Sequence, residues 1–282
     1  MPNSGFHELT FPRHRIGSDD VLRVTSDRQV IHGLIEVDMT DPLKTIHEYE
    51  QRTGDDISVV AFIAHCLGKA IDEDKRIQAF RLGRKLIVHD DVDVNIMIER
   101  EAGGGKIVAQ HVLRQTNRRG VLEMCREIRE SQRNPIEHGR PLRLLELYAA
   151  IPAFLRRPLM RLMLRNPHRF KAMGGTTAIT SVGMFGQGAG WGIPVVPVAV
   201  MLTLGGMAKK PAVVDGRIEI RDLLCVTVSF DHAITDGAPA ARFTSRLKQL
   251  IEGGSGLEVC RSAVSTEVDS DIVSKQVSAT FP

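Results

Sequence analysis

The stretch TVSFDHAITDGAPAARF, residues 227–243, sets a histidine, an aspartate and a glycine between two patterned segments. An apolar run that ends at Phe230 indicates a β-strand. After Gly237, apolar residues recur at helical spacing and Gly253 follows the last of them, which predicts a helix. His232 therefore lies at a strand-to-helix junction.

A histidine at such a junction suits a general base, because rigid elements fix the ring while the turn leaves it accessible. Imidazole, with a pKa of about 6.5, accepts a proton near neutral pH. The short motif leaves a second interpretation open, in which His232 is incidental and Asp236 is the N-cap of the helix. In both interpretations Gly237 lets the backbone turn sharply.

The rest of the chain predicts a sheet with covering helices. Alternating apolar residues predict strands over residues 31–39 and 92–98, and apolar runs predict strands over 176–182, 198–205 and 223–230. Helical spacing predicts a helix over 57–71, favoured at its start by Asp55 or Asp56, and another over 120–132. This order predicts an α/β (α+β) fold with a mixed β-sheet and helices on one face.

Composition narrows the function class. The 282 residues carry a formal charge of only +3 and 5% aromatic side chains, which argues against nucleic-acid binding. The four cysteines are widely spaced and predict neither a zinc site nor any other metal site. The chain shows no signal peptide and no apolar run of spanning length, so we expect a cytoplasmic protein.

We expect one domain over residues 1–252, with an N-terminal arm over 1–20 and a helical insertion over 141–171. The Ser- and Gly-rich residues 253–282 predict a mobile tail. Within the insertion, residues 143–171 are rich in Leu, Met and Arg, and Pro152 and Pro158 are expected to divide them into short helices. We favour a helical hairpin over the core, and the alternative is a basic amphipathic patch for a membrane or a partner.

Several blocks resemble one family in the right order. Residues 229–252 are similar to the pattern SxDHRxxDGxxxARF and its helix in the acyltransferase (E2) catalytic domain of 2-oxo acid dehydrogenase complexes. Upstream blocks of that domain are similar to residues 36–71, 84–98, 176–206 and 209–232. The resemblance covers about residues 20 to 252 and implies the chloramphenicol-acetyltransferase-like fold.

The resemblance also implies a reaction, the transfer of an acyl group between coenzyme A and a thiol such as dihydrolipoamide. His232 would take the proton of the thiol, and the hydroxyl of Thr180 would donate a hydrogen bond to the tetrahedral oxyanion. Ser181 is the neighbouring rival for that hydroxyl and a candidate substrate contact. Coenzyme A or acyl-CoA is the expected substrate.

Further roles follow from the resemblance. Asp236 would hold the loop through an arginine, with Arg13 and Arg15 as candidates. Lys209 or Lys210 would lie near the charged end of coenzyme A, and the favoured alternative is that both are ordinary surface lysines. A homotrimer is implied, with each active site shared between two subunits and with no further assembly, since the tail is polar.

The chain departs from the family at several points. Ala233 stands where the family has arginine, and Gln110 and His111 stand where an apolar turn is expected. The chain holds no lipoyl domain, so a separate lipoyl-bearing protein is the expected partner. A non-catalytic trimeric scaffold that retains the fold is the alternative to a stand-alone acyltransferase.

Overall fold

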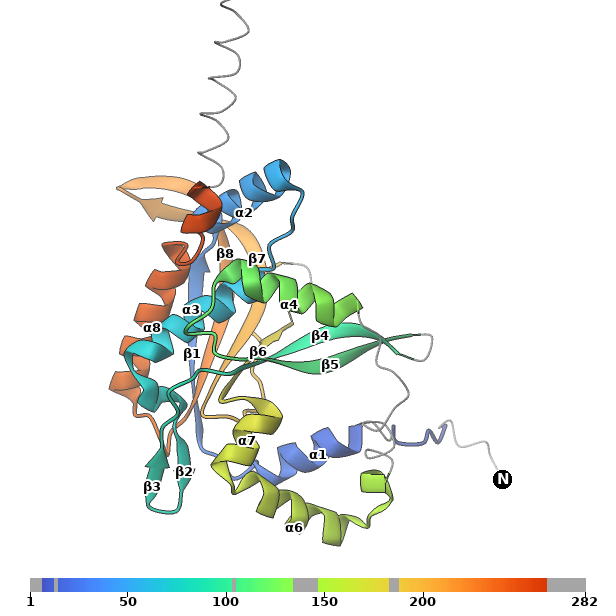
Figure 1. Ribbon diagram of the computed structural model, residues 1–282. Coiled ribbons are helices and arrows are strands. Elements are labelled where there is room, and N and C mark those ends of the chain that lie inside the picture. Colours follow the sequence, from blue (N-terminus) through green and yellow to red (C-terminus); the bar gives the residue numbers. More distant parts are fainter. Residues whose placement is uncertain (1–6, 13–14, 103–104, 134–146, 183–187, 263–282) are drawn as a thin grey trace, which may run out of the picture.

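A six-stranded sheet runs through the centre of the computed structural model, which describes residues 7–12, 15–102, 105–133, 147–182 and 188–262 (Figure 1). Its strands are β1 (Val30–Asp38), β4 (Val94–Ala102), β5 (Gly105–Leu113), β6 (Thr177–Ser181), β7 (Val200–Val214) and β8 (Arg217–Asp231), in the spatial order β1-β8-β7-β6-β4-β5. The β4–β6 and β6–β7 pairs are parallel and the other pairs antiparallel. The sheet is therefore mixed, as predicted.

The helices are α1 (Arg15–Val24), α2 (Thr40–Thr53), α3 (Val59–Glu73), α4 (Val121–Arg133), α6 (Ala153–Leu164), α7 (Pro167–Gly174) and α8 (Gly237–Glu252). A short 3-10 helix η1 (Lys75–Gln78) leads into a small hairpin of β2 (Phe80–Leu82) and β3 (Lys85–Ile87). No helix in the described part of the chain has both the length and the apolar character needed to cross a membrane.

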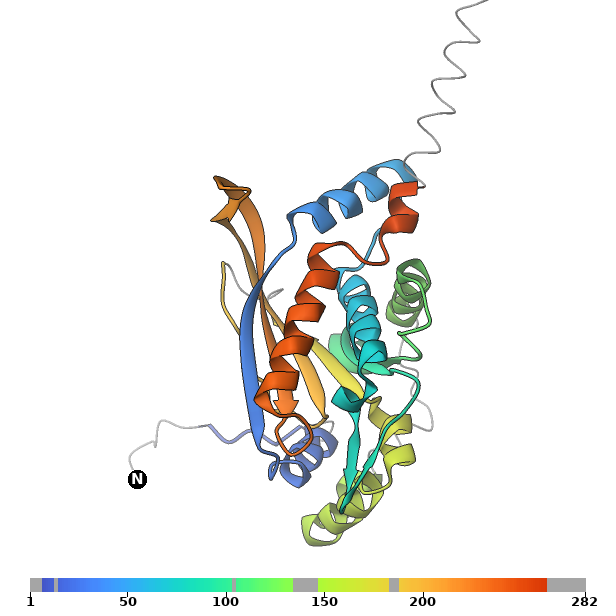
Figure 2. The same ribbon diagram turned by 90° about the vertical axis from the view of Figure 1, so that its left-hand side faces the viewer.

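The helices α3, α4 and α8 cover one face of the sheet (Figure 2). Alternate residues of β8, Val226, Val228 and Phe230, face them and are fully or almost fully buried, because side chains alternate across a strand. They pack in one core with Phe62 of α3 and Leu247 of α8. The prediction of helices on one face is confirmed.

The helix α3 begins at Val59, two residues after the predicted start. Ser58 is its N-cap, and the Ser58 hydroxyl accepts a hydrogen bond from the backbone N–H of Ala61 at 3.4 Å. A hydroxyl at this position satisfies one of the free N–H groups of the first turn.

The opposite face of the sheet is covered in part by residues 188–199. Trp191 Nε1 donates a hydrogen bond to the carbonyl of Ile35 at 3.1 Å, and the backbone of Gly190 pairs with Gly206 of β7. A Cβ atom at Gly206 would lie 1.9 Å from the carbonyl oxygen of Gly188, so only glycine permits this approach. The segment is thereby held against the sheet.

The predicted mobile tail is wrong for its first ten residues. Leu257 and Cys260 are fully buried in the main core, although the segment is too short to show a helical period. Residues 263–282 lie outside the described residues.

The predicted division of the insertion at Pro158 is also wrong. Pro152 stands at the N-cap of α6, but Pro158 lies inside that helix. Pro158 is exposed, so water can reach the carbonyl whose helical partner it removes. The first residues of the insertion, 141–146, lie outside the described residues.

Candidate active site

The loop between β8 and α8 carries His232 on a tight turn. The backbone N–H groups of Ile234 and Thr235 both donate to the carbonyl of Asp231, at 3.0 and 3.1 Å. The N–H of His232 donates to the carbonyl of Gln29 at 2.7 Å. The strand end and the residue before β1 thus fix the backbone of the histidine.

A buried ion pair anchors this loop. The carboxylate of Asp231 accepts a hydrogen bond from the guanidinium of Arg28 at 2.5 Å and another from the N–H of Ala233 at 3.0 Å. The sequence analysis assigned the anchor to Asp236 with Arg13 or Arg15. Arg13 lies outside the described residues and Arg15 begins α1, so the anchor seen in the structure is Arg28 with Asp231.

The side chain of Asp236 is exposed and lies close to His232. That side chain is 84% exposed, and its Oδ1 lies 3.7 Å from Nδ1 of His232, whose side chain is 46% exposed. This separation suits an ion pair with a protonated imidazole and is too long for a hydrogen bond. Asp236 occupies the N-cap position of α8, but its side chain makes no capping hydrogen bond.

Gly237 does not provide the sharp turn expected of it. It begins α8, its φ is outside the left-handed region, and no atom lies within 4 Å of the position a Cβ would take. Neither the conformation nor the packing of the described chain requires glycine here. The open space beside it is available to a bound molecule.

Thr180 lies far from His232 within one chain. The register sets Thr180 of β6 beside Thr203 of β7, and Thr203 beside Thr227 of β8, while Asp231 lies four residues further along β8. Two strand spacings and four residue steps separate Thr180 from Asp231 by about 16 Å. The structure does not bring the predicted base and the predicted oxyanion donor together in a single chain.

The two hydroxyls proposed for the oxyanion point to opposite faces of the sheet. Ile179 packs in the helix-side core, so Thr180 faces the side opposite the helices and Ser181 faces the helices. On the same face as Thr180, the buried hydroxyl oxygens of Thr203 and Thr227 have no hydrogen-bond partner among the described residues. Thr180 thus begins a row of hydroxyls across three strands.

Lys210 lies outside this site. Its ammonium pairs with the carboxylate of Glu36 and lies 5.8 Å from the centre of the Trp191 ring. Lys210 pairs in register with Arg221, ten residues from Asp231, which corresponds to about 30 Å along the strand. Lys209 is its neighbour on β7 and is equally distant.

Two of the departures from the family pattern have structural partners. Gln110 donates a hydrogen bond to the carbonyl of Met173 in α7 at 3.0 Å, and His111 Nε2 lies 2.7 Å from the carboxylate of Glu127 in α4. Both residues lie on β5, which is a strand and not a turn. These side chains tie β5 to the helices.

Two hollows flank the histidine loop. A groove of about 500 Å³ between β1 and α8 is lined mainly by apolar side chains and includes Gly237. A second cavity, of about 490 Å³, lies between the β2–β3 hairpin and α6 and borders Ala233, which stands where the family has arginine. Its lining includes four arginines, Arg28, Arg81, Arg161 and Arg165. An exposed, fixed histidine between these hollows is accessible to a substrate.

The site lies in a segment with known relatives. Residues 163–257 match the family model of the 2-oxoacid dehydrogenases acyltransferase (catalytic domain). That part of the chain is similar to the catalytic domain of these acyltransferases. The match includes β6, β8, the His232 loop and α8.

Individual acyltransferase relatives agree with this assignment. The chain is 39% identical over 84 residues to the dihydrolipoyllysine-residue acetyltransferase component of the pyruvate dehydrogenase complex of Zymomonas mobilis, covering 30% of this chain and 19% of the relative. It is 25% identical over 196 residues to the corresponding component of Rickettsia felis, covering 70% of this chain and 40% of the relative. The matches thus span less than half of these curated relatives.

A solved acyltransferase structure shows the same fold. A probable dihydrolipoamide acetyltransferase from Listeria monocytogenes superposes with a TM-score of 0.66 at 22% identity, over 90% of this chain and 97% of that chain. This likeness confirms the fold that the resemblance implied.

Proposed function

We propose that this protein is an acyltransferase that moves an acyl group between coenzyme A and a thiol, with His232 as the general base. The observation that carries the proposal is the position of His232, exposed on a fixed junction within the segment that matches the family. Dihydrolipoamide on a separate protein is the proposed second thiol.

The proposed reaction consists of proton transfers through His232 and an exchange of C–S bonds at the thioester carbon. His232 takes the proton of the attacking thiol, whose ordinary pKa of about 8.5 leaves it largely protonated at neutral pH. The thiolate forms a new C–S bond at the thioester carbonyl, and the carbonyl electrons move to its oxygen. Collapse of this tetrahedral intermediate breaks the old C–S bond, and the departing thiolate receives the proton from the imidazolium.

Charged and polar groups of the chain support these steps. The carboxylate of Asp236, 3.7 Å from the imidazole, stabilises the protonated ring. Thr180 is the proposed donor to the oxyanion. Because Thr180 lies about 16 Å from Asp231 in its own chain, it would serve the His232 of a neighbouring subunit in a homotrimer.

The groove between β1 and α8 suits the slender arm of coenzyme A. Its walls are mainly apolar, its volume is about 500 Å³, and Gly237 leaves open space at its side. An extended arm with few charges fits such a groove better than a bulky or charged group.

The test is acyl transfer measured as release of the free thiol of coenzyme A from a panel of acyl-CoAs, with dihydrolipoamide as acceptor. We expect His232→Ala to lower the rate by about 100- to 10,000-fold, since it removes the general base. Arg242→Ala on α8 is the control and retains the rate. Equal background thiol release by all three proteins would instead identify a non-catalytic scaffold.

A further inference from the structure

The helix α6 of the insertion buries one arginine and leaves most of its large apolar side chains exposed. Arg156, Met160 and Leu164 are four residues apart in sequence, so they lie on the same side of the helix, and all three are buried. On the other side Phe154 and Leu162 are 75% and 67% exposed, and Leu155 and Leu159 are exposed as well. An ordinary surface helix buries its large apolar residues, whereas α6 leaves these four exposed.

The inward orientation is fixed by a buried aspartate. Asp20 of α1 is fully buried and accepts hydrogen bonds from the guanidinium of Arg156 and the hydroxyl of Tyr148. Burial opposes its ionisation, but these hydrogen bonds hold the pKa of Asp20 below its ordinary value. The carboxylate is therefore charged and attaches α6 to α1 through Arg156.

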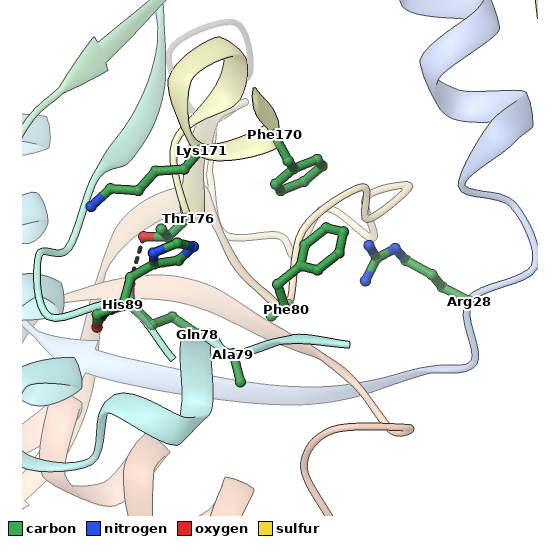
Figure 3. A pocket seen from close by; sticks show the side chains of 9 residues that line it. Arg28, Gln78, Ala79, Phe80, His89, Phe170, Lys171 and Thr176 are labelled. Atoms are coloured by element: carbon green, nitrogen blue, oxygen red, sulfur yellow. Dashed lines mark hydrogen bonds between the residues drawn. The ribbon is translucent and has the colours of Figure 1, made fainter. Parts of the chain in front are cut away.

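The following helix, α7, is attached as firmly. The ring of Phe170 packs against Phe80 with 5.3 Å between centroids, and the side chain of Lys171 extends in the other direction (Figure 3). The ammonium of Lys171 lies 3.8 Å from the carboxylates of both Asp91 and Asp93. The insertion is thus held to the body of the protein through both helices. Its exposed apolar side chains are consequently a fixed surface.

The favoured prediction for this segment, a helical hairpin over the core, does not explain the apolar outer side of α6. Only Met160 and Leu164 of its large apolar residues are buried. Four exposed apolar residues on one short helix are a contiguous patch of the kind that marks an interaction site.

The part of the insertion that the structure describes carries charge of one sign. Residues 147–174 contain no Asp or Glu. Arg161, Arg165 and Arg169 are exposed, and no carboxylate lies within ion-pair distance of them in the part of the chain that the structure describes. Arg161 and Arg165 also line the cavity of about 490 Å³ with Arg81, so cations continue along one flank of α6.

The positive charge of α6 distinguishes between two partners for the patch, a second copy of the chain and an anionic membrane. Two copies of the patch facing each other would bring the exposed arginines of one α6 against those of the other, which opposes self-association through α6. An anionic lipid surface offers both partners at once, phosphate groups for the arginines and acyl chains for the apolar side chains. In addition, α6 lies at the lower end of the molecule in both views, away from the sheet face that carries Thr180 (Figures 1 and 2).

We propose that α6 docks this protein on membrane surfaces that contain anionic phospholipids. Phe154, Leu155, Leu159 and Leu162 enter the boundary between headgroups and acyl chains, and Arg161, Arg165 and Arg169 contact lipid phosphates. The protein binds in the plane of the membrane surface, and the sheet face that carries Thr180 stays available for a neighbouring subunit. This proposal does not depend on the proposed acyl transfer.

The test is flotation of the full-length protein with phosphatidylcholine vesicles, prepared with and without phosphatidylglycerol. We expect binding to the vesicles with phosphatidylglycerol, and weaker binding to pure phosphatidylcholine. Phe154→Ser with Leu162→Ser should weaken binding by about tenfold or more, because it removes two inserting side chains. Arg161→Gln with Arg165→Gln should weaken it by about 10- to 30-fold and reduce its salt dependence.

The matched control is Val213→Ser with Ile220→Ser, which makes the same kind of exchange at exposed apolar residues of the β7–β8 hairpin. It should bind as the wild type does. Absence of wild-type binding, or equal weakening by the control pair, would overturn the proposal. A change of solution mass caused by Phe154→Ser with Leu162→Ser, without a change in vesicle binding, would instead assign the patch to contacts between copies of the chain.

Glycerophosphoglycerol separates a lipid surface from a soluble phosphate. At concentrations equal to those of the lipid headgroups, it should compete poorly, because it lacks acyl chains. Full competition would show that the arginines bind a soluble phosphate and would also overturn the proposal.

Discussion

The backbone of His232 owes its position to residues that lie far away in sequence. Arg28 precedes β1 and reaches the carboxylate of Asp231 across 203 positions of the chain. The carboxylate is 7% exposed, so water cannot take over the role of the guanidinium. Loss of Arg28 would leave a buried charge without its partner, and removal of one member of such a pair is strongly destabilising.

We predict that Arg28→Met lowers the free energy of unfolding by about 2 to 3 kcal/mol. The loss is smaller than for a fully buried pair, because the guanidinium of Arg28 is partly exposed. Arg23→Met is the matched control, since Arg23 pairs with Asp19 on the surface of α1, and it should change the free energy of unfolding far less. Urea unfolding of the three proteins measures both. Equal stability of the two variants would show that the buried pair does not anchor the loop.

At the scale of elements, two helical glycines have opposite environments. Gly68 lies inside α3, where an added Cβ would come within 2.7 Å of the backbone carbon of Thr116 and 2.8 Å of the nitrogen of Asn117. Gly237 begins α8 and would meet nothing. The first glycine is required by packing against the 116–117 segment, whereas the second leaves space for a ligand.

We predict that Gly68→Ala destabilises the protein by about 3 kcal/mol, because the backbone it meets cannot move aside cheaply. For Gly237→Ala, the free energy of unfolding should lie within about 1 kcal/mol of the wild-type value, since alanine is the better helix former. Its kcat/KM for acyl-CoA should nevertheless fall by about tenfold, because the added methyl group narrows the groove between β1 and α8. Denaturant unfolding and the thiol-release assay measure these effects, and unchanged kcat/KM would exclude Gly237 from the substrate groove.

At the scale of the whole molecule, the separation of Thr180 from His232 divides the proposed active site between two chains. The sheet is rigid and its register is continuous from β6 through β7 to β8. No rotation of a side chain covers about 16 Å. Catalysis by both residues therefore requires a neighbouring subunit.

This division predicts complementation between two inactive variants. His232→Ala and Thr180→Ala should each have low activity alone. Mixed oligomers from co-expression in equal amounts should regain about a quarter of wild-type activity, because one interface in four receives both intact residues at random. A mixture no more active than the separate variants would show that Thr180 does not serve a neighbouring His232.

Strands and helices with strong periodicity were predictable from the sequence. The alternation in β1 and β4 and the apolar run of β8 follow from burial of one or both faces of a sheet, and the spacing in α8 follows from burial of one side of a helix. β5 was missed because Gln110 and His111 interrupt its apolar pattern with side chains that bond to α7 and α4. The strands β2 and β3, with three residues each, are too short to show a period.

The candidate site was predictable only where it is local in sequence. The junction that carries His232 is visible in residues 227–243 because a strand and a helix flank it. Nothing near Arg28 marks it as the partner of Asp231, since the pair forms only when β1 lies beside β8. For α6, the spacing of its residues identifies two sides but not which of them faces inward, and Asp20 of α1 decides that.

The bond between Asp20 and α6 has a consequence for the history of this chain. Without the insertion, the carboxylate of Asp20 would lose the guanidinium of Arg156 and the hydroxyl of Tyr148 together. Without Asp20, in turn, the buried guanidinium of Arg156 would lack a counter-charge, which is costly. Among related chains we therefore expect an acidic residue at this point of α1 wherever α6 carries a buried arginine.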